Sequence, residues 1–153
     1  MAADYSTLSV LVIDDQAVAR QWVRGVLGTL GIERVVEAKS SREALQAVTE
    51  RGARFDLILC DLRMPGKDGI ETIRMLASMG LQCAVAILSI EDERVIESAG
   101  LLATLRGLNL VGAVSKPLNV EKLEQILARA TEVRGQKMPA TIDVADGELA
   151  GAL

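Results

Sequence analysis

Short apolar runs alternate with helical patterns along most of the chain, and this alternation restricts the fold more than any other feature of the sequence. The runs are rich in Val, Ile and Leu, as buried strands are, and they comprise residues 8–13, 33–38, 56–60, 84–88 and 111–114. The stretches between and after them place apolar residues at helical spacing and comprise residues 16–30, 40–51, 68–79, 92–108 and 119–133. Five strands and five helices in strict order predict a doubly wound α/β fold with a five-stranded parallel sheet.

Local signals add detail to two helical stretches. In the first, residues at helical spacing form an apolar face, which comprises Val18, Ala19, Trp22, Val23, Val26, Leu27 and Leu30. In the second, Ser40 and Glu43 form a capping box, in which each side chain satisfies a backbone N–H of the other residue. After residue 133 the pattern breaks, so we predict one domain over residues 1–133 and a linker over residues 134–153.

The composition limits the setting and the chemistry. The chain has 153 residues, enough for one domain with a sizeable core, and its apolar stretches are far shorter than the roughly 20 residues of a membrane span. Its start lacks the basic residues and apolar stretch of a signal peptide, so we expect a cytoplasmic location. Histidine is absent, which excludes histidine-based triads and most transition-metal sites. A net charge of −4 argues against nucleic-acid binding by this segment.

The two cysteines agree with a reducing compartment. Cys60 lies within a predicted strand and Cys83 at the edge of another. No spacing resembles a zinc site, and we interpret both residues as buried thiols. Because aromatics make up only 2% of the residues, the core around them must be aliphatic.

Polar groups follow four of the predicted strands, at the point where each strand ends. They are, in chain order, Asp14, Asp15, Asp61, Ser89 and Lys116. In open α/β sheets, ligands bind outside the carboxyl ends of the strands, so we expect these groups to converge. Three carboxylates, a hydroxyl and an ammonium group there predict a cation site beside an acceptor for a phosphoryl group.

Each residue also has an ordinary role when it is considered alone. The adjacent acids Asp14 and Asp15 repel each other unless a cation or a lysine lies between them, but they also fit a solvated turn in which one acid caps the next helix. Asp61 can close a buried strand, Ser89 can cap a helix or turn, and Lys116 can be solvated. Their joint order on four strands favours a common site over these separate roles.

The combined motifs resemble the receiver domain of bacterial two-component response regulators. The resemblance covers roughly residues 9–133. It is carried by Leu-Val-Ile-Asp-Asp ending at Asp15, Asp-Leu-Arg-Met-Pro-Gly-Lys-Asp-Gly starting at Asp61, Leu-Ser ending at Ser89, and Lys-Pro starting at Lys116. It implies a flavodoxin-like (CheY-like) sheet with strand order 2-1-3-4-5 and five helices.

The resemblance also implies a role for each acid. Asp61 is implied as the phosphoacceptor, which takes a phosphoryl group from the phosphohistidine of a sensor kinase. Mg²⁺ is implied at Asp15, Asp61 and the backbone carbonyl of Arg63, with Asp14 contributing through water. The domain would catalyse only its own phosphorylation and dephosphorylation.

Ser89 and Lys116 are implied as the groups that respond to phosphorylation. Ser89 would be the switch hydroxyl that moves to the phosphoryl group, and Lys116 would pair with that group. The added charge would then reorganise the loop and helix after Ser89. Many receivers carry Tyr or Phe three residues before the lysine, where this chain has Ala113, so we expect the output to pass through backbone or helix movement.

Two further features depart from the usual receiver. The chain between Ser89 and Lys116 is several residues longer than in a typical receiver, and the extra length falls in residues 91–109. We expect either a lengthened fourth helix or a remodelled loop there. Arg63 and Glu91 each lie two residues beyond a site residue. We predict that they form an ion pair that slows hydrolysis of the phosphoryl group, the alternative being two solvated side chains.

The resemblance implies a sensor histidine kinase or a phosphotransfer protein as partner. Residues 107–117 and the tail from Asp146 are similar to receivers joined to EAL-type cyclic-di-GMP phosphodiesterase domains, which implies an output domain in cis. The face formed by the fourth helix, fifth strand and fifth helix is a candidate homodimer surface. Four apolar residues fit either this surface or the core: Val95, Ala99, Leu102 and Leu110.

Two other classes of function compete with a signalling domain. A phosphatase that turns over an aspartyl phosphate generally needs a second acid and a substrate cap, and the chain after Asp61 offers Arg63 and no inserted cap. An unphosphorylated pseudo-receiver would act as an interaction module with an unused site. The complete set of acids and Lys116 favours a phosphoacceptor over both.

Overall fold

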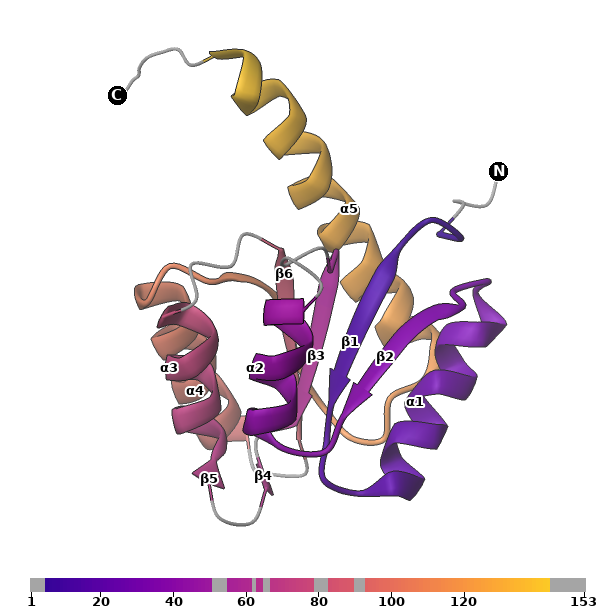
Figure 1. The fold of residues 1–153 in the computed structure, drawn as a ribbon, viewed down its shortest axis with the longest axis vertical. Helices are drawn as coiled ribbons and strands as arrows, with labels where there is room; N and C mark the ends of the chain where they lie inside the picture. Colours follow the sequence, from indigo (N-terminus) through magenta and orange to yellow (C-terminus); the bar gives the residue numbers. More distant parts are fainter. Residues whose placement is uncertain are drawn as a thin grey trace.

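Five parallel strands form a central sheet in the computed structural model, which describes residues 5–50, 55–61, 63–64, 67–78, 83–89 and 93–143 (Figure 1). The sheet order is β2-β1-β3-β6-β7, and its strands are β1 (Ser9–Ile13), β2 (Arg34–Ala38), β3 (Leu57–Asp61), β6 (Ala84–Ser89) and β7 (Asn109–Ser115). The helices are α1 (Ala17–Thr29), α2 (Ser41–Glu50), α3 (Gly69–Ser78), α4 (Glu93–Leu105) and α5 (Val120–Asp143). β6 and β7 are the fourth and fifth strands of this sheet in chain order, so the predicted strand order 2-1-3-4-5 is confirmed.

Helices cover the sheet on both faces. α1 and α5 pack on one face, and α2, α3 and α4 pack on the other (Figure 1). Side chains of β1 alternate between these two cores, with Val10 and Val12 on the α1 side and Leu11 and Ile13 on the α2 side. Burial on both faces explains why the central strands are continuous apolar runs.

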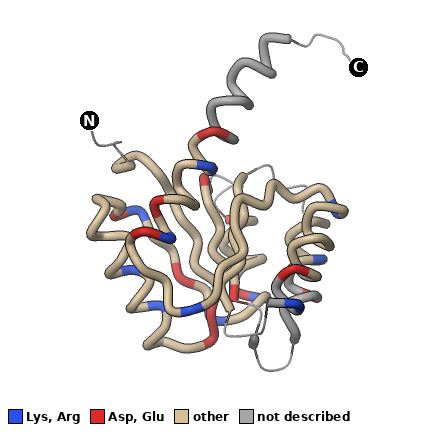
Figure 2. The backbone as a smooth tube through the Cα atoms, turned by 180° about the vertical axis from the view of Figure 1, so that it is seen from behind, with Lys and Arg blue, Asp and Glu red and all other residues tan. Residues whose placement is uncertain are grey.

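Charge is nearly excluded from the sheet and spread over the helices that flank it (Figure 2). Within the three central strands β1, β3 and β6, Asp61 is the only charged residue, and it is buried. A buried carboxylate at the end of a central strand needs a charged partner or a cation.

Among the described residues, no helix is long and apolar enough to cross a membrane.

The arrangement of β1 and β3 positions the site. The two strands pair in parallel, with Ile13 beside Cys60, so their carboxyl ends lie side by side. The chain leaves β1 for α1 on one face and continues from β3 towards α3 on the other. This reversal is the switch point at which α/β sheets bind ligands.

The apolar face predicted for the first helix is only partly buried. Val23 and Leu27 are buried as expected, but Val18 is 77% exposed and Trp22 is 56% exposed. The sheet contacts only one side of α1. The apolar residues of this helix cover a wider part of its circumference than the sheet does. Val18 and Trp22 therefore lie on the solvent side.

The start of α2 and the end of α4 can be compared with what the sequence predicted. At α2, the Ser40 hydroxyl accepts a hydrogen bond from the Glu43 N–H, but the Glu43 carboxylate accepts one from Lys39 rather than from Ser40. α4 ends at Leu105, because Gly107 adopts a left-handed conformation (φ 88°) and closes a Schellman motif. The stretch before β7 is thus a helix followed by a turn.

α5 continues to Asp143 instead of ending near Val133, so half of the predicted linker is helical. Residues 144–153 lie outside the described part of the chain.

The loop predicted after Asp61 also differs, because β4 (Arg63–Met64) and β5 (Lys67–Asp68) form a short antiparallel pair there.

Candidate functional site

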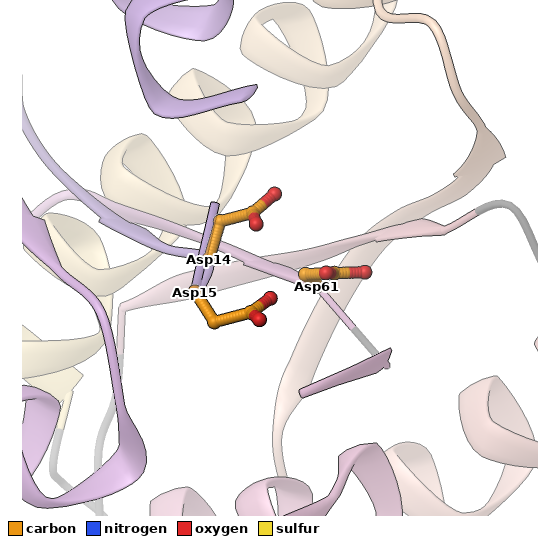
Figure 3. A group of neighbouring side chains, drawn as sticks. All are labelled: Asp14, Asp15 and Asp61. Atoms are coloured by element: carbon orange, nitrogen blue, oxygen red, sulfur yellow. The ribbon is translucent and has the colours of Figure 1, made fainter. Parts of the chain in front are cut away.

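Three carboxylates converge at the carboxyl ends of β1 and β3 (Figure 3). Asp14 and Asp15 directly follow β1, and Asp61 is the last residue of β3. One oxygen from each lies within 4.8 Å of the others. Asp14 and Asp61 are buried, and Asp15 is half-buried.

Lys116 reaches the same point from the end of β7. Its Nζ lies 2.6 Å from Oδ2 of Asp14 and 3.5 Å from Oδ2 of Asp61. The lysine is therefore shared between the two buried acids, which offsets part of the repulsion that the carboxylates exert on one another. The predicted convergence of Asp14, Asp15, Asp61 and Lys116 is confirmed.

The turn that carries the acids, residues 14–16, is fixed by several hydrogen bonds. The Asp14 N–H donates to the carbonyl of Ala38 at the end of β2 (3.0 Å). Oδ1 of Asp14 accepts a hydrogen bond from the Gln16 N–H (2.9 Å), which closes a local turn, and the N-cap residue of α1, Gln16, makes no side-chain capping hydrogen bond. We refer to residues 14–16 as the acid turn.

Arg20 connects the acid turn to β2. Its Nη1 donates to the Asp14 carbonyl (2.7 Å), and its Nε pairs with Glu37 (2.9 Å). Arg24 pairs with the other oxygen of Glu37 (2.8 Å). Partial burial acts to raise the pKa of Glu37, but the hydrogen bonds from Arg24 and Arg20 outweigh it and the pKa is lowered.

The loop after Lys116, residues 116–119, is held from three directions, and we call it the lysine loop. The Lys116 N–H donates to the Ser89 carbonyl (2.8 Å). Nζ of Lys122, in α5, donates to the carbonyl of Ser115 (2.9 Å), just before the loop. Nε1 of Trp22, in α1, donates to the carbonyl of Leu118 (2.7 Å). The Lys116–Pro117 peptide is cis.

Ser89 ends β6, beside Ser115 of β7, and it is fully buried. Its place in the sheet puts it at the same edge as the carboxylates and the lysine. The side chains of Arg63 and Glu91 lie outside the described part of the structure, so their predicted ion pair stays a prediction. The carbonyl of Arg63 as a ligand also stays a prediction, with Arg63 placed at the start of β4.

The neighbouring thiol does not take part in chemistry at this edge. Cys60 precedes Asp61 and is fully buried, and burial together with the charges of Asp61 and Asp14 raises its pKa to about 12. A thiol with that pKa stays protonated at neutral pH and is a poor nucleophile. Both cysteines are free thiols; Cys60 is buried as predicted, but Cys83 is only half-buried.

The residues fit a hard divalent cation. Three carboxylates and one ammonium group leave the site with a surplus of negative charge. Oδ1 of Asp15 is buried, and among the described residues it has no hydrogen-bond partner. A buried carboxylate oxygen without a partner is costly unless a ligand satisfies it, and Mg²⁺ prefers carboxylate oxygens.

Sequence reasoning missed Arg20, Trp22 and Lys122 as supports of the site. For Arg20 a signal existed, because it lies three and seven residues before the buried Val23 and Leu27 and so places a charge on the buried stripe of α1. No such pattern distinguishes Trp22 or Lys122. Their contacts depend on how the two helices pack.

A known protein family matches the part of the chain that contains all of these site residues. Residues 10–128 match the family model of the response regulator receiver domain. The chain belongs to this family. It is accordingly a receiver domain of a two-component response regulator, a signalling domain in whose family phosphorylation of an aspartate is typical.

Individual relatives of this receiver domain differ in length. The cyclic di-GMP phosphodiesterase RocR of Pseudomonas aeruginosa is 31% identical over 140 residues, which cover 91% of this chain and 35% of RocR. The two-component response regulator ORR41 of Oryza sativa subsp. japonica is 35% identical over 126 residues, which cover 80% of this chain and 93% of ORR41. This chain thus spans about a third of RocR and nearly all of ORR41.

Solved structures agree with the fold. The chemotaxis protein CheY4 of Vibrio cholerae superposes with a TM-score of 0.67 at 30% identity, covering 80% of this chain and 98% of CheY4. A receiver domain protein of Clostridium thermocellum has a TM-score of 0.69 at 26% identity and covers 86% of this chain. The CheY-like fold predicted from the sequence is confirmed.

Proposed function

We propose that the receiver domain accepts a phosphoryl group on Asp61 and changes conformation in response. The observation that supports this most is the position of Asp61. It is the only charged residue of the three central strands, and it lies 3.5 Å from the ammonium group of Lys116 and beside two further carboxylates. A carboxylate with these neighbours is suited to attack phosphorus.

The proposed step is the transfer of one phosphoryl group from phosphohistidine. A carboxylate oxygen of Asp61 forms a bond to phosphorus as the bond between phosphorus and the imidazole nitrogen breaks. The electron pair of that bond stays on the nitrogen. Lys116 then stabilises the charge on the transferred group, and a bound Mg²⁺ supplies the remaining neutralisation that phosphoryl transfer requires.

We propose Asp15, Asp61 and the carbonyl of Arg63 as Mg²⁺ ligands, with Asp14 acting through water. The contacts of the two adjacent acids support this division. Both oxygens of Asp14 already have partners, Gln16 and Lys116, whereas Oδ1 of Asp15 has none among the described residues. Asp15 is therefore the acid of the pair that is open to direct coordination.

Ser89 is the proposed switch hydroxyl. It is buried at the end of β6, and the chain leads from it to α4. A move of Ser89 towards a phosphoryl group on Asp61 would shift the backbone that precedes α4. Ala113 is exposed on β7 and carries no ring, so this receiver must transmit the change through α4 and its connection.

A sensor histidine kinase or a phosphotransfer protein is the proposed donor. The apolar side chains of Val18 and Trp22 are exposed on α1, which directly follows the acid turn, and we propose them as part of the docking face. On α4, Leu101 and Leu105 are also exposed, and we propose them as part of a surface for a second receiver. Leu102 and Leu110 pack against the core instead, while Val95 and Ala99 have side chains outside the described residues.

We propose residues 1–133 as the receiver and residues 134–153 as the connection to an output domain in cis. The relation to RocR favours an EAL-type cyclic-di-GMP phosphodiesterase as that domain. The long α5 extends away from the body of the domain, towards the part of the chain where an output domain would follow (Figure 1). The two cysteines without a disulfide agree with a cytoplasmic location.

Incubation with acetyl phosphate and Mg²⁺ tests the proposal. We expect a phosphoprotein that forms with wild-type protein and fails to form with Asp61→Asn. Continuous release of phosphate in many turnovers would instead indicate a phosphatase. No incorporation at all would favour the pseudo-receiver, and either result would contradict the proposal.

A further inference from the structure

We propose that Trp22 is a positioning residue for Lys116, acting through the lysine loop. Its indole N–H donates a hydrogen bond to the carbonyl of Leu118, two residues after Lys116. The bond spans 96 positions in the sequence and joins α1 to the loop that precedes α5. This inference rests on the proposed phosphorylation of Asp61, in which Lys116 pairs with the phosphoryl group.

The contact joins the two halves of the site. α1 begins directly after the acid turn, and the lysine loop begins at Lys116 itself. Lys122 also holds this region, with bonds to the carbonyls of Ser115 (2.9 Å) and Pro117 (3.3 Å), but it belongs to α5, the helix that follows the loop. The bond from Trp22 fixes the loop against the helix that carries the acids.

The environment of Trp22 indicates that this bond matters more than apolar burial. Trp22 is 56% exposed and belongs to neither hydrophobic core, so it contributes little to apolar burial. Leu118, in contrast, is fully buried, and its carbonyl is held close to α1. A tryptophan whose ring is largely in water and whose N–H meets a backbone carbonyl at 2.7 Å is placed for that hydrogen bond.

The step that Lys116 performs is sensitive to small displacements. Lys116 must remain within reach of Asp61, and Nζ already lies 3.5 Å from Oδ2 of that residue. Loss of one support of the loop lets the ammonium group spend more time paired with Asp14 alone or in other positions. The rate of phosphorylation should then fall, while the acids that bind Mg²⁺ keep their arrangement.

Trp22→Phe tests this role, because it keeps an aromatic ring and removes only the N–H donor. We expect phosphorylation by acetyl phosphate to slow by about two- to tenfold, the effect of losing one ordinary hydrogen bond. Mg²⁺ affinity, measured by isothermal titration, should change less than twofold. Gln21→Ala is the matched control, since Gln21 is exposed on the same helix next to Trp22 and is not part of the site.

A double-variant comparison separates positioning from a general structural effect. In the Lys116→Met background, Trp22→Phe should cause no further loss of rate, because the group that it positions is gone. An undiminished effect in that background would overturn the inference, as would an unchanged rate for Trp22→Phe in the wild-type background. Failure of the wild-type protein itself to take up phosphate would instead refute the proposed function, and the inference with it.

Discussion

The acid turn and the lysine loop form the two halves of one site, but they are supported in different ways. The acid turn is held by backbone bonding to β2 and by Arg20, which is only 15% exposed. The lysine loop has one backbone bond to the sheet, from the Lys116 N–H to the Ser89 carbonyl, and its other supports are side chains from two helices, Trp22 and Lys122, of which Trp22 is largely exposed. The acid turn is thus supported by a largely buried arginine, while the lysine loop depends more on exposed side chains and on helix packing.

This difference suggests how a receiver domain can hold a cation site in place and still change conformation on phosphorylation. The carboxylates need a fixed geometry, since repulsion among them must be offset in the resting state as well as in the phosphorylated one. Lys116 and Ser89 must respond to a new charge, so weaker support of their connections is an advantage. The predictions below test whether the acid half is the rigid one.

The largest expected effect concerns thiol reactivity beside Asp61. At pH 8 a pKa of about 12 leaves Cys60 with roughly a thousandfold less thiolate than an ordinary thiol of pKa near 8.5. We therefore expect iodoacetamide to modify the half-buried Cys83 much faster than the fully buried Cys60. Peptide mass spectrometry measures both rates, and comparable rates would show that the end of β3 opens readily.

Mg²⁺ affinity should respond in opposite directions in the two halves. Asp15→Asn removes the proposed ligand and should weaken binding by about tenfold or more. Lys116→Met removes a positive charge near the cation site, so affinity should stay equal or rise. Calorimetric titration at fixed ionic strength measures both, and a similar loss in both variants would contradict the division of the site.

Two arginines that share Glu37 allow a matched comparison of stability. Arg20→Met leaves the buried carbonyl of Asp14 without its donor and should cost about 1–3 kcal/mol. Arg24→Met breaks a pair in which the arginine side chain is 47% exposed, and should cost about 1 kcal/mol or less. Urea unfolding measures both values; equal losses would mean that Arg20 supports the acid turn no more than Arg24 does.

The smallest expected effect is the pH dependence that Glu37 contributes. Its pKa is lowered in the folded protein, so the unfolded chain takes up the proton first as the pH falls. The stabilisation is present above the unfolded pKa of about 4.3 and is lost as the pH falls through the folded value. The difference in unfolding free energy between wild type and Glu37→Gln, about 1 kcal/mol or less at pH 7, should shrink at low pH. A difference that stays constant with pH would refute this assignment.

The sequence predicted the sheet and the site well because both depend on regular patterns. Apolar runs of strand length and polar residues at their ends placed Asp14, Asp61 and Lys116 together before any packing was known. The parallel register of β1 and β3 follows from the same order. These features require only the alternation of elements and the rule that ligands meet the carboxyl ends of strands.

Other features depended on packing that no local pattern encodes. Trp22 fits the apolar arc of α1, but the sheet covers a narrower strip, and the residue bonds to Leu118 instead of entering the core. Gly135 and Pro139 indicated an early end to the last helix, yet α5 continues through both to Asp143. A proline inside a helix has a suitable φ but removes one backbone hydrogen bond and usually kinks or ends the helix, which is why the sequence favoured an earlier end.

The most direct test of the central claim is to locate the phosphoryl group chemically. Acetyl-phosphate-treated protein would be reduced with borohydride, which converts an aspartyl phosphate to homoserine, and then digested and mapped by mass spectrometry. We predict homoserine at position 61, dependent on Mg²⁺ and on the phosphodonor. Unmodified Asp61 in protein that carries phosphate elsewhere, or in protein that carries none, would contradict the account.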